Sequence, residues 1–388
     1  MLRHRTFLAA IAAAVALTAA LPPATADTAA AREEDPDAIA AARLKEFGQG
    51  YVSHIDRDRR LIYISALDKQ NLDDTVALLA DYTDAQRKTL FKQPLLWYVT
   101  VILPTVEHYR KLAPRTTAVG FYHPAKRTLI SIDRGRTLLH EYTHALHHAD
   151  QAAAGQVHPI WVTEGLATLF EAAEITPEGL NPVVDNRLGA IQRAIHTGSC
   201  PPLKWLLGCN AELFMKDPSL TYAQARYVMF YLHQQGQLEA WYAAFKQSFP
   251  RNATGQAALE SILGQAIEGL DLRWKQWTAK VAVPAGLRQD YRGRLGIQMN
   301  DDSRGVKIIS MLPQGAAAQA GRLRVGDVIT AYSERPVRKP AELAAAIRAT
   351  GELKTVTIQI LRNNEPLTIL QPLGTAGGAG SPPAGSVH

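Results

Sequence analysis

Two histidines four residues apart constrain this chain more than any other feature. They lie in the stretch His140-Glu141-Tyr142-Thr143-His144. On an α-helix, residues four apart lie on the same face, so both imidazole rings can bind one metal ion. Glu141 lies one step round the helix, beside the water that such an ion would hold. The pattern therefore predicts a helix next to an open site, with a further ligand supplied from elsewhere in the chain.

Two acidic residues are candidates for that further ligand. A hydrolytic zinc site usually has three protein ligands and one position open for water. Glu164 lies at the start of the next predicted helix, whereas Asp150 follows His144 by only six residues. In families with the shorter spacing, a glycine lets the helix break and the chain turn back. Here His147 occupies that place and the pattern stays helical, so we expect Glu164 to be the third ligand.

The two segments together resemble the gluzincin zinc metallopeptidases. Residues 161–171, which include Glu164, resemble in particular the bacterial peptidase-MA-like group. The resemblance implies an α+β fold with a β-sheet lobe, a helical lobe and one Zn²⁺ between them. It implies His140, His144 and Glu164 as the zinc ligands. In this clan a strand just before the metal helix borders the cleft, which points to residues 128–132 here.

The same resemblance assigns the chemistry. Zinc would lower the pKa of a water molecule, and Glu141 would take its proton and pass it to the leaving amine. Residues 221–225 resemble the helix start that supplies an aromatic hydroxyl in the zinc aminopeptidases. Tyr222 would then stabilise the oxyanion, although a half-buried helix tyrosine is the plain alternative.

One position departs from the family pattern. In thermolysin-like members, an acid four residues past the glutamate ligand orients a ligand histidine. Thr168 stands at that position, and Glu171 follows one turn later. The departure leaves a second interpretation open: a binding or scaffold protein of the cell envelope whose peptidase domain has lost turnover. The intact set of His140, Glu141, His144 and Glu164 favours the enzyme.

A second recognisable unit begins after the Val-Pro-Ala-Gly sequence at residues 283–286. It resembles a PDZ domain of the bacterial protease-associated kind, over residues 286–373. The resemblance implies a groove for C-terminal peptides, in which a glycine exposes backbone N–H groups and a strand pairs with the peptide. A PDZ fold with an unused groove is the alternative. The predicted peptide-binding residues are Leu295, Gly296, Ile297, Leu343 and Ile347.

The N-terminus has the pattern of a secretory signal peptide over residues 1–26. Arg3 and Arg5 precede an apolar run, and Ala24-Thr25-Ala26 supplies a cleavage site. We expect export, and the pairing of modules resembles envelope proteases of Gram-negative bacteria, so we expect a periplasmic location. The remaining predicted segments are a lead-in (27–48), the metallopeptidase domain (49–282), the PDZ domain (286–373) and a disordered tail (374–388).

The chain contains two cysteines, Cys200 and Cys209. In an oxidising compartment they are expected to form a structural disulfide. A two-thiolate metal site is the alternative, but no nearby histidine or cysteine completes such a set.

Composition limits the other classes of function. The chain has 388 residues, a formal charge of +6, 47% hydrophobic residues and 20% charged residues, which excludes extensive disorder. Lysine and arginine are scattered, so we expect no nucleic-acid partner, and no segment after the signal peptide is apolar enough to span a bilayer. Apolar spacing predicts strands at 61–64, 96–101 and 128–132 and helices at 72–90, 136–149, from 161, at 222–235, 257–279 and 340–350.

Overall fold

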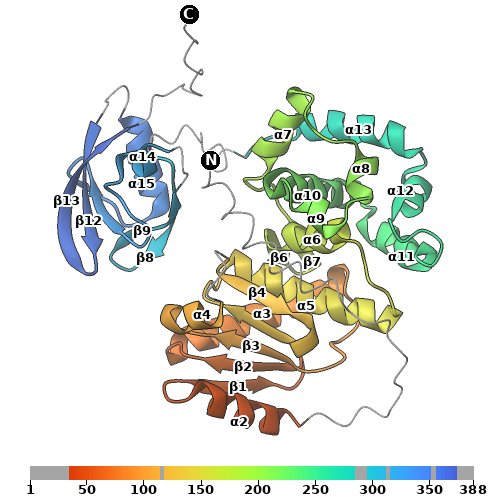
Figure 1. Cartoon of the computed structure of the whole chain (residues 1–388), viewed down its shortest axis with the longest axis horizontal. Helices are drawn as coiled ribbons and strands as arrows, with labels where there is room; N and C mark the ends of the chain where they lie inside the picture. The colour runs from red at the N-terminus through yellow and green to blue at the C-terminus, as the bar shows by residue number, and fades with distance from the viewer. Residues whose placement is uncertain (1–34, 114–117, 285–294, 312–314, 351–354, 374–388) are drawn as a thin grey trace, which may run out of the picture. The chain divides into compact units, whose positions relative to one another are not determined.

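The computed structural model describes residues 35–113, 118–284, 295–311, 315–350 and 355–373 (Figure 1). They form two compact units, with the boundary between Val283 and Pro284. The predicted signal peptide, the first part of the lead-in (27–34) and the predicted tail (374–388) lie outside the described residues. Within the described ranges, no helix has both the length and the apolar character that a membrane span requires.

A five-stranded mixed sheet forms the first half of the N-terminal unit. Its strand order is β1 (Val52–Asp56), β2 (Leu61–Ser65), β3 (Val99–Leu103), β5 (Thr128–Ser131) and β4 (Gly120–His123). The three central strands are parallel, and the two outer strands are antiparallel to their neighbours. All residues of the central strands are buried, as expected of parallel strands covered on both faces. The strand at 128–132 is therefore interior, and the edge strand beside it is β4, which corrects the sequence-based expectation.

Successive side chains of each strand point to opposite faces of this sheet, and helices cover both faces. Leu61 and Tyr63 of β2 join one buried cluster, whereas Ile62 and Ile64 join another. Helices α3 (Lys69–Thr89) and α5 (Arg136–Ala154) contribute to the first cluster. Helices α2 (Pro36–Phe47) and α4 (Val106–Leu112) contribute to the second. The helical α2 lies in the predicted lead-in.

The second half of the unit is helical and shares the first buried cluster with the sheet. Helix α10 (Pro218–Gln234) is buried along most of its length and packs against α6 (Ile160–Phe170). The predicted helix at 257–279 is two helices, because Gly264 adopts a left-handed conformation (φ 66°) between them. The other elements are β6 (Ala173–Thr176), β7 (Gly179–Pro182), α7 (Leu188–His196), α8 (Leu203–Leu207), α9 (Ala211–Phe214), α11 (Leu238–Ser248), α12 (Gln256–Leu263) and α13 (Ile267–Lys280).

The C-terminal unit is built on one antiparallel sheet. Its main strand order is β13 (Glu365–Pro372), β12 (Thr355–Arg362), β10 (Val328–Tyr332), β9 (Gly305–Met311) and β8 (Ile297–Asp302), and the short β11 (Arg335–Pro336) pairs with β10. Helices α14 (Ala316–Ala320) and α15 (Pro340–Ala349) complete the unit. It has a hydrophobic core of its own. Strand β8 is an edge of the sheet, and α15 contacts it.

Candidate metal centre

Two helices supply the candidate ligands. Helix α5 begins after Gly135, where the Asp133 carboxylate accepts a hydrogen bond from the Thr137 N–H (2.8 Å). It continues without a break to Gly155, whose left-handed conformation ends it. His140 and His144 lie one turn apart on this helix, and Glu164 lies on the neighbouring α6. All three side chains are largely buried, with exposed fractions of 14%, 14% and 9%.

The donor atoms of these three side chains converge on one point. The Nε2 atoms of His140 and His144 are 3.1 Å apart, and Glu164 Oε2 lies 3.4 and 3.6 Å from them. A tetrahedral centre with metal–ligand bonds of about 2.1 Å has edges of about 3.4 Å. The three separations therefore fit three corners of such a centre. Among the described residues, this is the one group of three or more His, Cys, Asp or Glu side chains brought together in this way.

The chemistry of the three donors also fits a zinc ion. None of the described residues gives the buried Glu164 Oε2 a hydrogen bond, although a buried carboxylate oxygen normally requires one. Burial acts to raise the pKa of Glu164, but His144 and His140 outweigh it and hold the pKa well below its usual value. The side chain is therefore an ionised carboxylate. Two imidazoles and one carboxylate are a ligand set that hydrolytic zinc sites use.

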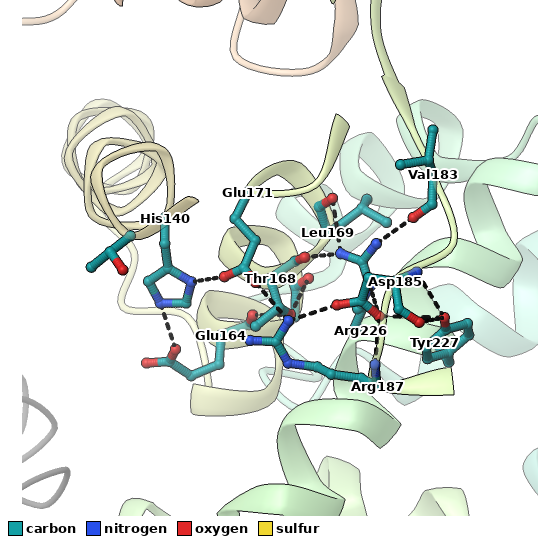
Figure 2. A network of polar contacts seen from close by, with 12 residues as sticks. His140, Glu164, Thr168, Leu169, Glu171, Val183, Asp185, Arg187, Arg226 and Tyr227 are labelled. Carbon is teal, nitrogen blue, oxygen red and sulfur yellow. Dashed lines mark hydrogen bonds and ion pairs between the residues drawn. The ribbon is translucent and has the colours of Figure 1, made fainter. Parts of the chain in front are cut away.

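Glu171 contacts the far side of His140. Its Oε2 lies 2.7 Å from His140 Nδ1 (Figure 2). Burial acts to raise the pKa of Glu171, but Arg187 and His140 lower it to about 2. Burial acts to lower the pKa of His140, but Glu164 and Glu171 raise it to about 10.

Thr168, which stands where the family pattern has an orienting acid, does not take that role. Its hydroxyl donates to backbone carbonyls of its own helix, those of Glu164 (2.6 Å) and Gly165 (3.1 Å).

Glu141 and Tyr222 both lie near the candidate ligands, because Glu141 acts to raise the pKa of His140 and Glu164 acts to raise that of Tyr222. Glu141 Oε2 accepts a hydrogen bond from the backbone N–H of Tyr122 on the edge strand β4 (2.8 Å). Tyr222 lies on α10, and its ring packs against Phe214. Burial raises the pKa of Tyr222 well above its usual value, and the nearby carboxylates of Glu164 and Glu141 raise it further. Tyr222 is therefore a neutral phenol that can donate a hydrogen bond into the site.

Asp150, the other candidate for the third ligand, is engaged elsewhere. Its carboxylate accepts a hydrogen bond from the Tyr242 hydroxyl (2.6 Å) and pairs with Lys246 Nζ (3.0 Å). Helix α5 has no break before Asp150, so the chain does not turn back toward His144. The structure thus brings Glu164, rather than Asp150, to the histidine pair.

The predicted disulfide is not formed in the structure. Cys200 and Cys209 are buried free thiols. Cys209 Sγ lies 3.4 Å from the Trp205 carbonyl, and Cys200 Sγ points to the carbonyl of Pro201. The two sulfur atoms therefore contact separate backbone groups at either end of the segment that contains α8.

Some residues of the site were not identified from the sequence. Tyr122 comes to Glu141 only because β4 packs beside α5. Arg187, which pairs with Glu171, precedes α7 and has no motif around it. The sequence places Glu171 one turn past the expected position of an orienting acid, but it does not show the contact with His140. The spacing of seven residues between Glu164 and Glu171, two helical turns, is a signal that could have indicated a shared face.

The C-terminal unit places its predicted peptide-binding residues in two environments. Gly296 has a φ of 67°, a left-handed conformation that glycine adopts without strain, and Ile297 after it is half-buried. Leu295, Leu343 and Ile347 are buried members of the core of this unit. The turn at Gly296 and the adjoining edge strand β8 are therefore the accessible part of the predicted groove.

The fold and the sequence of this unit define its class. Residues 293–370 match the PDZ domain family, and the C-terminal unit is a PDZ domain. A curated relative is the periplasmic pH-dependent serine endoprotease DegQ of Escherichia coli (strain K12), 34% identical over 76 residues. The match covers 20% of this chain and 16% of the length of DegQ, so the likeness concerns the PDZ domain and not the activity of DegQ as a whole.

Solved structures give two further likenesses. An aminopeptidase N family protein from Idiomarina loihiensis aligns over 84% of this chain and 67% of its own, with 12% identity and a TM-score of 0.36. The HtrA3 PDZ domain bound to a phage-derived ligand aligns over 21% of this chain and 81% of its own, with 21% identity and a TM-score of 0.18. With TM-scores below 0.5, neither likeness supports a conclusion about this chain.

Proposed function

We propose that this chain is an exported, zinc-dependent peptidase whose PDZ domain recruits substrates or partners through their C-termini. The observation on which the proposal depends is the spacing of His140 Nε2, His144 Nε2 and Glu164 Oε2, at 3.1 to 3.6 Å. Within the part of the chain that the structure describes, no hydrogen bond reaches the buried Glu164 Oε2, whereas a cation at the centre of the three atoms would satisfy it.

His140, His144 and Glu164 would hold the zinc ion. When bound there, zinc supplies the acidification of water and the polarisation of a carbonyl group. Glu141 is the general base: it accepts a proton from the attacking water and returns it to the leaving amine. The hydrogen bond from the Tyr122 N–H to Glu141 Oε2 fixes the orientation of this carboxylate.

Tyr222 would stabilise the negative charge that develops on the substrate carbonyl oxygen. Its raised pKa keeps the proton on the phenol, so the hydroxyl can donate to an oxyanion. The side chain comes from α10, which is buried along most of its length, so little reorganisation is needed when the charge appears.

The PDZ domain would bring polypeptides to the peptidase unit. The left-handed Gly296 and the edge strand β8 are the elements with which such domains hold a terminal carboxylate and an extended peptide. DegQ, which the PDZ domain of this chain matches, is periplasmic. We propose the same location for this chain, in keeping with the signal-peptide pattern of residues 1–26.

The alternative is an envelope binding protein with a degenerate peptidase domain. Its main support was Thr168, which stands where an orienting acid is expected. Glu171 contacts His140 Nδ1 at 2.7 Å and can take the place of that acid. The departure at Thr168 is therefore a weak reason to expect loss of turnover.

The decisive experiment for this function compares Glu141→Gln with the wild type. The purified chains are incubated with a mixture of unstructured peptides, and cleavage is followed by mass spectrometry. We expect the variant to retain zinc and to lose cleavage by about 100-fold or more, because the general base is removed. Glu174→Gln, at an exposed glutamate of β6, is the matched control and should cleave normally. A wild-type chain that binds zinc but cleaves nothing would favour the binding protein.

A further inference from the structure

Glu171 has the geometry of a residue that orients a metal ligand. It is the C-cap of α6, two helical turns after Glu164, and its Oε2 lies 2.7 Å from His140 Nδ1. An ionised carboxylate only accepts hydrogen bonds, so Nδ1 carries a hydrogen, and Nε2 is the nitrogen left to bind an ion at the point shared with His144 and Glu164. Glu171 thereby fixes both the tautomer and the ring orientation of His140.

Glu171 is itself held by a chain of alternating charges, of which Arg187 is partly exposed and the others are buried. Its Oε1 accepts a hydrogen bond from Arg187 Nη1 at 2.6 Å, and the same nitrogen donates to Asp185 Oδ2 at 2.7 Å. Asp185 Oδ1 in turn lies 3.0 Å from Arg226 Nε, and both of these side chains are fully buried. We refer to Glu171, Arg187, Asp185 and Arg226 as the acid–arginine chain (Figure 2). Its two acids and two bases balance, so no net charge is left in the interior.

Arg226 joins this chain to the backbone at the end of α6. Its guanidinium donates to the carbonyls of Thr168 and Leu169 and to that of Val183 (2.6 Å). The bonds to Thr168 and Leu169 satisfy carbonyls of the last turn of α6, just before Glu171. Arg226 also lies four residues after Tyr222, on the same face of α10. One set of contacts therefore links the helix of Glu164 to the helix of Tyr222.

We propose that Glu171 is the positioning residue for His140, the role that an acid at position 168 would otherwise have. Arg187 and Asp185 hold the Glu171 carboxylate in place. This inference rests on the proposed zinc site, and it assigns no contact with substrate to any of the four residues. A merely structural role would predict a different result: loss of Glu171 would weaken folding and leave the affinity for zinc unchanged.

Zinc affinity separates the two roles. The dissociation constant is measured on the full chain by competition with a chromogenic chelator, and the melting temperature is measured with the metal removed. We expect Glu171→Gln to weaken zinc binding by about 10- to 100-fold, because the substitution removes the carboxylate behind a ligand histidine. The absorption spectrum of the cobalt-substituted protein should also change, since the ring orientation of His140 sets the ligand field.

Asp150→Asn is the matched control. Asp150 is a buried carboxylate on the same helix as His140 and His144, and it pairs with Lys246 and Tyr242. Its loss should lower the melting temperature of the metal-free chain and leave the zinc dissociation constant within about twofold of wild type. If Glu171→Gln behaves as this control does, the inference is overturned.

Arg187→Gln keeps the proposal testable if Glu171→Gln does not fold, because Arg187 is partly exposed. We expect zinc binding about 3- to 10-fold weaker, since Glu171 stays but loses its anchor. Unchanged affinity would contradict the role of the acid–arginine chain. A wild-type chain that binds no zinc would overturn the proposed function and this inference together. If the wild type binds zinc and both variants have the same zinc dissociation constant as the wild type, the inference alone is overturned.

Discussion

At the scale of single residues, the N-terminal unit keeps several charges away from water and pairs each of them. Arg226 and Asp185 are the extreme case, because neither side chain has any exposed surface. An unpaired charge at such a depth is costly, so each partner depends on the other. The same reasoning applies to Glu164, whose buried carboxylate oxygen lies beside two histidines.

The first prediction concerns Arg226→Met. The substitution leaves Asp185 buried without its partner and several backbone carbonyls without a donor, so the free energy of unfolding should fall by about 3–5 kcal/mol. Urea denaturation of the metal-free chain measures this change. Arg193→Met, at an exposed arginine of α7, should change the same quantity by less than about 0.5 kcal/mol. Equal effects of the two substitutions would contradict the assignment of Arg226.

The second prediction concerns Tyr222→Phe. Loss of the hydroxyl removes one donor to the proposed oxyanion, so kcat should fall by about 100-fold while KM and zinc content change little. Steady-state kinetics with a cleaved peptide measures the effect. Tyr231→Phe, at a buried tyrosine of α10, is the control and should be near wild type. A normal kcat in Tyr222→Phe would assign Tyr222 to packing.

The third prediction is a loss of stability in acid that depends on His158. Its Nε2–H donates to Gln156 Oε1 (2.9 Å), so its Nδ1 accepts from His147 Nε2–H (2.8 Å). Burial, with a smaller contribution from Lys246, lowers the pKa of His158 to about 3. Since the unfolded pKa is near 6.5, the unfolded state binds the proton more tightly. The stabilisation is complete above pH 6.5 and is lost as the pH falls toward 3.

Between pH 6.5 and pH 5 this one group should lower the free energy of unfolding by about 1–2 kcal/mol. His158→Asn keeps an acceptor for His147 but cannot take up the proton. We expect its unfolding free energy to fall less than that of wild type over this range, in urea titrations at each pH. Parallel pH profiles for the two proteins would show that His158 does not titrate as described.

At the scale of elements, the position of Glu164 depends on how closely α6 approaches α10. Gly165 makes this approach possible, because a Cβ atom there would lie 3.1 Å from Met229 Cγ and 3.2 Å from the Ala225 carbonyl. Glu164 is the preceding residue, so any displacement of α6 moves a candidate ligand directly.

The fourth prediction follows from this contact. Gly165→Ala should force α6 away from α10 and lower the free energy of unfolding by about 1–3 kcal/mol, with weaker zinc binding. Gly189→Ala is the matched control, since Gly189 lies in helix α7 and a Cβ atom there would lie 3.5 Å from Arg193 Nη1, an ordinary contact. That substitution should stabilise the chain by about 0.5–1 kcal/mol through helix propensity. Stabilisation by both substitutions would contradict the close packing of α6 on α10.

Elements with a strong local signal could be predicted from the sequence. The spacing of His140 and His144 and the run of helix-compatible residues after them predicted α5, and the apolar runs at 61–64 and 128–132 predicted β2 and β5. The order of the strands in the sheet could not be predicted, because no local pattern in the sequence shows with which strand β4 pairs. Arg187 and Tyr122 reach the site only through tertiary packing, and no local pattern marks them.

At the scale of the whole molecule, the chain consists of two compact units with separate hydrophobic cores. The candidate ligands all belong to the N-terminal unit. The C-terminal unit has a hydrophobic core of its own, and a domain needs such a core to fold by itself.

The fifth prediction is that the two units unfold separately and that only one of them responds to metal. Calorimetry of the full chain should show two transitions, and a chelator should lower the temperature of the larger one and leave the smaller one in place. A peptide with a free C-terminus should do the reverse and stabilise only the smaller transition. A single transition that both ligands shift would mean that the units are thermodynamically coupled.

The central claim is the three-ligand zinc site, and elemental analysis of the purified chain tests it most directly. The account predicts one zinc ion per chain in the wild type and in Glu141→Gln, and little zinc in Glu164→Ala after the same dialysis. Zinc that stays stoichiometric in Glu164→Ala but is lost in Asp150→Ala would contradict the ligand assignment, and a wild-type chain without zinc would contradict the site itself.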